Sequence, residues 1–121
     1  MGVTPLDRPA PEGATGGPID LDRVREGLEA LRALGLPLAV LTNKPAAPAR
    51  ELLRRKGLDG FFAQVFGGDS FARKKPDPLP LLGTCEALGT QPSATWMVGD
   101  SRNDAEAARG AGCRPVPAAA A

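Results

Sequence analysis

The chain has 121 residues, a length typical of a single domain. Its hydrophobic content of 42% and charged content of 24% fit a soluble globular protein, and its net charge of +1 gives no general attraction for nucleic acid or an acidic membrane. The absence of histidine excludes histidine-based acid–base catalysis and histidine metal ligands within the chain. Because no apolar run approaches the ~18 residues of a membrane span and the N-terminus lacks a signal-peptide core, we expect a cytoplasmic protein.

Glycine and proline dominate residues 1–19, and apolar residues are scattered there. This composition predicts a disordered leader. The low-complexity residues 117–121 predict a flexible tail, so the folded domain is expected over residues 20–116.

Regular elements alternate between these ends. Apolar residues at helical spacing, each run followed by glycine, predict helices at residues 20–34, 47–56, 79–88 and 103–110. In the third helix we expect Leu82, Cys85 and Leu88 to point inward. Short apolar runs predict strands at 36–41, 61–66, 95–98 and 113–116. This alternation predicts an α/β fold, a Rossmann-like parallel sheet with flanking helices.

Two cysteines, Cys85 and Cys113, are far apart in the sequence and match no metal-binding spacing. Cys85 belongs to an apolar helical face and Cys113 begins a predicted strand. We therefore expect both to be buried free thiols.

Three polar side chains follow predicted strands or lie in the loops between them. Thr42 and Asp100 come directly after strands, and Lys75 lies in a proline-rich loop. Ligands of parallel sheets bind at the carboxyl ends of the strands, so this placement predicts a site. The prolines that follow Lys75, Pro76 and Pro78, favour a stiff, extended loop at this lysine.

Considered one at a time, Thr42, Lys75 and the Asp100–Asp104 pair each allow a ligand-binding interpretation and a purely structural one. Asp100 and Asp104 are four residues apart across a strand-to-helix turn and suit a magnesium ion; equally, Asp100 and Ser101 suit a helix cap. Thr42 is suited either to hydrogen-bond a phosphate oxygen or simply to begin a turn. Lys75 is suited either to bind a phosphate or to lie solvated in a basic loop.

Taken together, four segments resemble the C-terminal part of the core domain of haloacid dehalogenase superfamily phosphatases, with the bacterial phosphoglycolate phosphatases as the nearest likeness. The segments are 24–31 (VREGLEAL), 38–45 (LAVLTNKP), 74–82 (KKPDPLPLL) and 98–104 (VGDSRND). The resemblance implies hydrolysis of a phosphate monoester through an aspartyl-phosphate. By the same likeness Thr42 and Asn43 bind the phosphoryl group, Lys75 steadies the phosphate and the nucleophile, and Asp100 and Asp104 hold Mg²⁺.

One part of the family pattern is missing. The family nucleophile belongs to an Asp-x-Asp-Gly-Thr motif after an apolar strand, whereas this sequence has only Asp20-Leu21-Asp22-Arg23. The expectation is a truncated core that lacks the central nucleophile strand and the cap domain and is inactive alone. The alternative is a non-catalytic phosphate- or partner-binding module. A response-regulator receiver is disfavoured, because receivers carry their aspartate before the threonine and the lysine.

The missing strand predicts a gap in the sheet. The strands that end at Thr42 and Val98 would flank it, and residues 1–19 are too rich in glycine and proline to fill it. The two strands must pair directly, leave a groove or accept a strand from another chain, and we expect the groove. Because such a groove exposes unpaired strand edges, we expect self-association or binding of a complementing N-terminal fragment.

Overall fold

The computed structural model describes residues 2–3, 21–99 and 101–117. It contains four α-helices within these residues: α1 (Leu21–Ala33), α2 (Ala46–Arg55), α3 (Leu79–Leu88) and α4 (Arg102–Ala111). The strands are β1 (Gly2–Val3), β2 (Ala39–Leu41), β3 (Gln64–Phe66), β4 (Trp96–Val98) and β5 (Arg114–Val116). Short 3₁₀ helices η1 (Asp59–Phe61) and η2 (Pro92–Ala94) precede β3 and β4.

The predicted helices and strands after residue 20 are present, but all four strands are shorter than predicted, β2 and β3 by three residues each and β4 and β5 by one. β2 begins at Ala39 instead of residue 36, because Pro37 has no N–H to donate to a neighbouring strand. β3 begins at Gln64, since Asp59–Phe61 forms η1. The α/β architecture with flanking helices is confirmed.

The sheet has five strands in the order β3-β2-β1-β4-β5. β2 pairs in parallel with β3, and β4 pairs in parallel with β5. β1 lies between the two parallel pairs and is antiparallel to both, with Val3 opposite Val40 on one side and Val98 on the other.

The expectation of an open groove between the strands ending at Thr42 and Val98 is therefore wrong. The inner edges of β2 and β4 carry backbone groups that are costly to leave unpaired, and Gly2–Val3 pairs with them. The argument from glycine and proline content failed because this strand is only two residues long and contains no proline. The predictions for residues 4–19 and 118–121 lie outside the described part of the chain.

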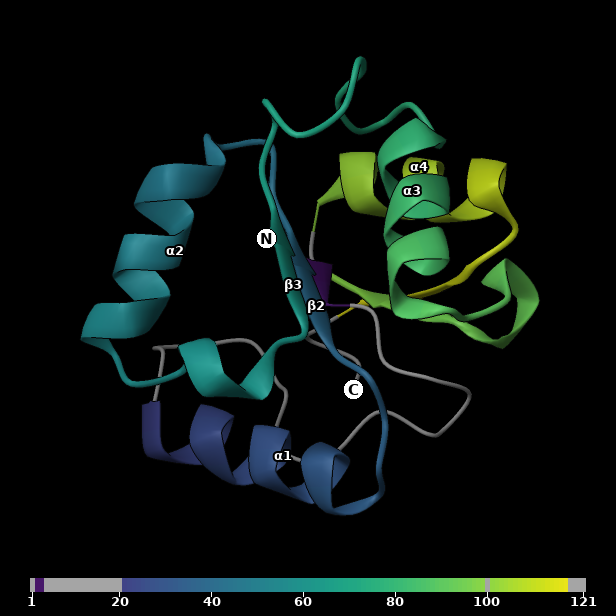
Figure 1. The fold of residues 1–121 in the computed structure, drawn as a ribbon. Coiled ribbons are helices and arrows are strands. Elements are labelled where there is room, and N and C mark those ends of the chain that lie inside the picture. The colour runs from purple at the N-terminus through teal and green to yellow at the C-terminus, as the bar shows by residue number, and fades with distance from the viewer. Residues whose placement is uncertain (1, 4–20, 100, 118–121) are drawn as a thin grey trace.

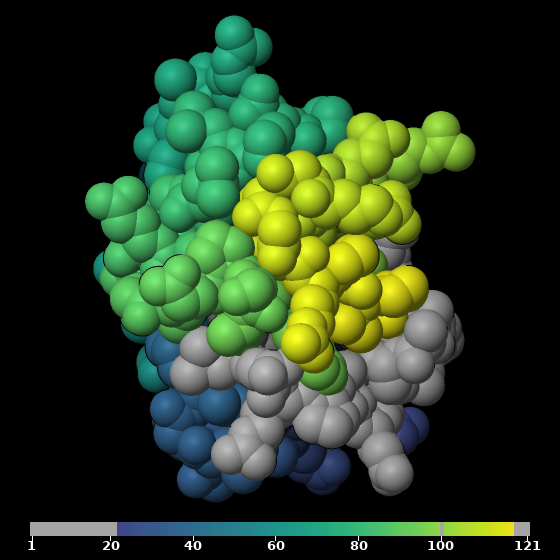
Figure 2. Space-filling view, turned by 90° about the vertical axis from the view of Figure 1, so that its right-hand side faces the viewer, coloured from purple at the N-terminus to yellow at the C-terminus, as the bar shows by residue number. Residues whose placement is uncertain are grey.

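Helices cover both faces of the sheet (Figure 1). Side chains alternate along β2: Val40 packs with α1 and α2 residues, whereas Leu41 packs with α3 and α4 residues. The parallel neighbour β3 repeats this pattern with Val65 and Phe66. On the face of the sheet that α3 and α4 cover, the space-filling view shows α3 (green) and α4 (yellow) side by side (Figure 2).

The prediction for the third helix was wrong at one position. Leu82 is 42% exposed, whereas Leu81, Thr84 and Cys85 are buried. The inward face of α3 therefore follows the spacing 81, 84, 85 and 88, and Leu82 lies about 100° around the helix from Leu81. Packing against the sheet selects this face. The sequence pattern could not identify it, because most residues of α3 are hydrophobic on every side of the helix.

Candidate functional site

A buried ion pair joins two segments at the carboxyl ends of β2 and β4. The ammonium of Lys75 lies 2.5 Å from Oδ1 of Asp104 in the first turn of α4, and the two residues are 5% and 3% exposed. Lys75 Nζ also donates to the carbonyl of Leu41, the last residue of β2, at 2.9 Å. Lys75 thus connects its own loop, the end of β2 and the start of α4.

The carboxyl of Asp104 is held in its charged form. Burial opposes the charge, but hydrogen bonds from Lys75 and Ser101 and the positive charge of Lys75 outweigh that effect and lower the pKa of Asp104. Ser101 is the N-cap of α4, and its Oγ accepts a hydrogen bond from the Asp104 backbone N–H at 3.1 Å. The predicted capping role of Ser101 is confirmed.

The lowered pKa of Asp104 predicts a loss of stability in acid. The unfolded chain takes up the proton near the ordinary aspartate value of about 4, whereas the folded chain takes it up only at lower pH. Stability is therefore complete above about pH 4 and falls as the pH drops through the folded-state pKa. Urea midpoints at about pH 6 and about pH 3 should differ in the wild-type chain and differ less in Asp104→Asn. An equal drop in the variant would contradict this assignment.

Asn43 fixes the loop after β2 against the Lys75 loop. Its side-chain amide donates to the Lys75 carbonyl at 2.9 Å, and its side-chain oxygen accepts from the Lys75 backbone N–H at 3.1 Å. Thr42 is 5% exposed, and its hydroxyl oxygen accepts from the Lys44 N–H at 3.2 Å. Its side chain therefore holds two loops together, and the predicted role of Asn43 in phosphoryl binding stays a prediction.

These residues surround an open depression of about 250 Å³, lined by Thr42, Asn43, Lys44, Lys75, Ser101, Asn103 and Asp104. The described lining contains two lysines and one carboxylate, so its net charge is positive. Lys75 has three N–H donors, of which Leu41 and Asp104 take two, so one remains. The Thr42 hydroxyl likewise keeps its proton to donate. The depression therefore presents hydrogen-bond donors suited to an oxyanion.

The segment after β3 supports the loop after β2, a role that the sequence did not reveal. The Gly68 N–H donates to the Lys44 carbonyl at 2.8 Å, and Asp69 Oδ1 accepts from the Ala46 N–H at the start of α2 at 2.9 Å. A Cβ on Gly68 would come within 2.2 Å of the Asn43 carbonyl oxygen, so no larger residue fits without moving the loop. The signal in the sequence is the pair Gly67-Gly68, which comes directly after the predicted strand at 61–66.

Asp69 caps α2 from a distance of 23 residues, because Pro45 at the N-cap position has no hydrogen-bonding side chain. Asp69→Ala should lower the free energy of unfolding by about 1 kcal/mol, and Asp69→Asn, which keeps an acceptor oxygen, should lower it by less. Urea unfolding of the three chains measures this order. Equal losses in both variants would show that the hydrogen bond from the Ala46 N–H to the Asp69 side-chain oxygen is not what stabilises α2.

Of the predicted metal ligands, Asp104 is described and Asp100 lies outside the described residues. A Cβ added to Gly99 would come within 2.2 Å of Asp104 Oδ2, so this second carboxylate oxygen lies against the end of β4. No cluster of three or more potential Asp, Glu or Cys ligands occurs among the described residues. The described oxygen donors at the depression, from Ser101, Asn103 and Asp104, are of the type that magnesium prefers.

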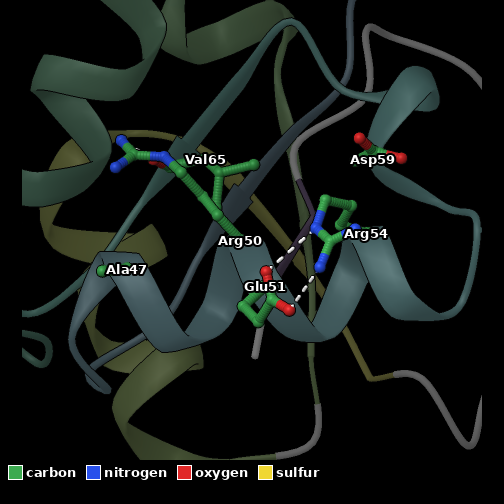
Figure 3. A pocket seen from close by; sticks show the side chains of 6 residues that line it. All are labelled: Ala47, Arg50, Glu51, Arg54, Asp59 and Val65. Atoms are coloured by element: carbon green, nitrogen blue, oxygen red, sulfur yellow. Dashed lines mark hydrogen bonds and ion pairs between the residues drawn. The ribbon is translucent and has the colours of Figure 1, made fainter.

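A second depression, of about 390 Å³, lies beside α2 and is lined by Ala47, Arg50, Glu51, Arg54, Asp59 and Val65 (Figure 3). Its guanidinium groups already have partners. Arg54 pairs with Glu51, an interaction that lowers the pKa of Glu51, and Arg50 donates to the Val65 carbonyl at 2.9 Å. The charges of its two arginines and two carboxylates cancel, so this depression does not attract an anion.

A family model described as haloacid dehalogenase-like hydrolase matches residues 13–112. The chain therefore belongs to the haloacid dehalogenase-like hydrolases, as the four sequence segments predicted.

Similar proteins carry a narrower description. The chain is 52% identical over 90 residues to a phosphoglycolate phosphatase of Neisseria meningitidis, which covers 74% of this chain and 38% of that protein. It is 44% identical over 111 residues to the phosphoglycolate phosphatase of Escherichia coli, covering 92% and 44%. A crystal structure titled as a predicted phosphoglycolate phosphatase from Haemophilus somnus superposes with a TM-score of 0.75 at 44% identity, covering 78% of this chain and 42% of that one. The chain thus spans about two-fifths of these proteins.

The helices that the structure describes include none with the length and apolar character needed to cross a membrane.

Proposed function

We propose that the depression at the ends of β2 and β4 binds the phosphoryl group of a small phosphate monoester, with phosphoglycolate as the substrate suggested by the similar proteins. The observation that carries the proposal is the Lys75–Asp104 pair beside Thr42. The pair places an ammonium with one remaining N–H and a threonine hydroxyl in one depression, whose described lining has a net positive charge.

Each residue has a role in this proposal. Thr42 donates its hydroxyl to a phosphoryl oxygen, and Lys75 donates its third N–H while its charge stabilises the anion. Asn43 keeps the two loops in register through its paired hydrogen bonds. Asp104 accepts a hydrogen bond from the Lys75 ammonium and orients it.

We assign Mg²⁺ as the cofactor, with Asp100 as its principal ligand and the second carboxylate oxygen of Asp104 as a further donor. The assignment of Asp100 rests on the sequence. When bound, the ion would neutralise negative charge on the phosphoryl oxygens. Lys75 already occupies Asp104 Oδ1, so this chain by itself should bind magnesium weakly.

Hydrolysis by the family route needs the aspartate nucleophile of the Asp-x-Asp-Gly-Thr motif, which this sequence does not contain. We infer that the chain binds phosphate but does not turn it over unless another segment supplies that aspartate. A non-catalytic phosphate-binding module is the second candidate, and the same missing motif favours it. In either case the position of β1 between β2 and β4 is where a complementing strand would dock.

An NMR titration with inorganic phosphate tests the binding proposal. Millimolar phosphate should shift the amides of residues 42–44 and 75, and Thr42→Val should weaken the apparent affinity by about tenfold, the effect of losing one hydrogen bond to a charged group. Arg50→Gln is the matched control, because it removes a cation from the second depression, and it should leave the affinity unchanged. Equal shifts in the wild-type and Thr42→Val chains would contradict the proposal.

A further inference from the structure

The two cysteines lie together in the folded chain although 28 positions separate them. Cys85 belongs to α3, and Cys113 immediately precedes β5; their sulfur atoms are 3.8 Å apart. Both are free thiols, and they are 1% and 5% exposed. The prediction of buried free thiols is confirmed, but no feature of the sequence indicated that the two thiols meet.

Their surroundings are apolar and firmly held. Both cysteines belong to the core cluster on the α3–α4 face of the sheet, together with Leu81, Met97 and Ala108. The Cys113 N–H donates to the Ala108 carbonyl at 2.8 Å, which fixes Cys113 directly after α4. The pair therefore connects α3 with the α4–β5 connection, on the side of the molecule where α3 and α4 pack against each other (Figure 2).

The two thiols are not equivalent. A hydrogen bond from Cys113 lowers the pKa of Cys85 to about 6 against the opposing effect of burial, and the hydroxyls of Thr95 and Thr90 assist. The hydrogen bond to Cys85 and burial raise the pKa of Cys113. Because the thiolate is the reactive form, Cys85 is the thiol expected to react first.

We propose that Cys85 and Cys113 form an oxidisable dithiol that a hydroperoxide converts to an intramolecular disulfide. The Cys85 thiolate attacks one oxygen of hydrogen peroxide, the O–O bond breaks, and the departing hydroxide takes a proton to become water. Cys85 is then a sulfenic acid. The Cys113 sulfur attacks the Cys85 sulfur, its proton leaves with the displaced hydroxide as a second water, and the S–S bond forms. Two thiols are oxidised and one peroxide is reduced.

Burial determines the oxidant. With 1% and 5% exposure, the sulfurs favour a small oxidant such as hydrogen peroxide, which needs a smaller opening of the core than a bulky disulfide such as oxidised glutathione. Closure requires the sulfurs to move from 3.8 Å to about 2.05 Å. The new bond would link α3 to the start of β5 inside the core, independently of the phosphate site.

The test is peroxide treatment of the whole chain, followed by removal of peroxide, unfolding and alkylation. The chain has two cysteines, so the number of alkylated thiols should fall from two to none, and a protease digest should contain one cross-linked peptide that joins Cys85 to Cys113. The thermal midpoint should rise by on the order of 10 °C and return on reduction. Retention of both thiols, or a disulfide found only between two chains, would overturn the proposal.

A second measurement keeps the test independent of the stability of any variant. Early after peroxide addition, unfolding of the wild-type chain in the presence of dimedone should trap the sulfenic acid on Cys85 in preference to Cys113. In Cys113→Ala, where the resolving thiol is absent, the dimedone adduct on Cys85 should accumulate and no intramolecular disulfide should form. Preferential trapping on Cys113, or an absence of adduct in both chains, would overturn the proposed order of reaction.

Discussion

Lys75→Met is expected to lower the free energy of unfolding by about 3–5 kcal/mol, because it leaves the Asp104 carboxylate buried without its partner. Asp104 is 3% exposed, so solvent replaces little of the lost interaction. The variant also removes the donor to the Leu41 carbonyl at the end of β2. Urea unfolding at neutral pH measures the loss.

The double variant Lys75→Met with Asp104→Leu is the matched control. Replacement of both charges by apolar side chains of similar volume often restores stability, since no unpaired charge remains. We expect the double variant to be more stable than Lys75→Met alone. A single variant that loses less than about 1 kcal/mol would show that the pair is solvated, as is usual for surface ion pairs.

The chain alone is expected to hydrolyse phosphoglycolate and p-nitrophenyl phosphate no faster than buffer that contains magnesium. Removal of the nucleophile from a covalent mechanism reduces the rate by a factor on the order of 10⁴ or more. Release of inorganic phosphate measures this directly. Addition of a peptide with an apolar strand and an Asp-x-Asp-Gly-Thr motif should raise the rate if the peptide displaces Gly2–Val3 from its place between β2 and β4.

Asp100→Asn is the control for the activity measurement. Magnesium-dependent turnover by the wild-type chain that disappears in Asp100→Asn would contradict the prediction of inactivity. It would mean that a carboxylate such as Asp20 has replaced the family nucleophile.

The sequence predicted most of the helices and strands because their signals are local. Apolar spacing and terminal glycines identified α2, α3 and α4 within a residue or two, and Gly57, Gly89 and Gly112 follow them with positive φ. β1 was not predicted, because a two-residue strand has no periodicity. What stabilises it is the pair of open strand edges that it joins, and these exist only in the folded sheet.

The sequence also predicted which segments meet at the site, but not what every side chain does there. Thr42 and Lys75 lie together because parallel strands place their carboxyl ends at one edge. The Lys75–Asp104 contact and the Cys85–Cys113 contact each depend on side-chain packing between segments 28 or 29 positions apart. Asp69 was missed for the same reason, since its partner is the backbone of Ala46 at the start of α2.

A crystal structure of the chain soaked with tungstate, a phosphate mimic that scatters X-rays strongly, tests the central claim most directly. The account predicts an anomalous peak in the depression beside β2 and β4, within hydrogen-bonding distance of Thr42 Oγ1 and Lys75 Nζ. A peak at the Arg50 and Arg54 side chains with none beside Thr42 would contradict it.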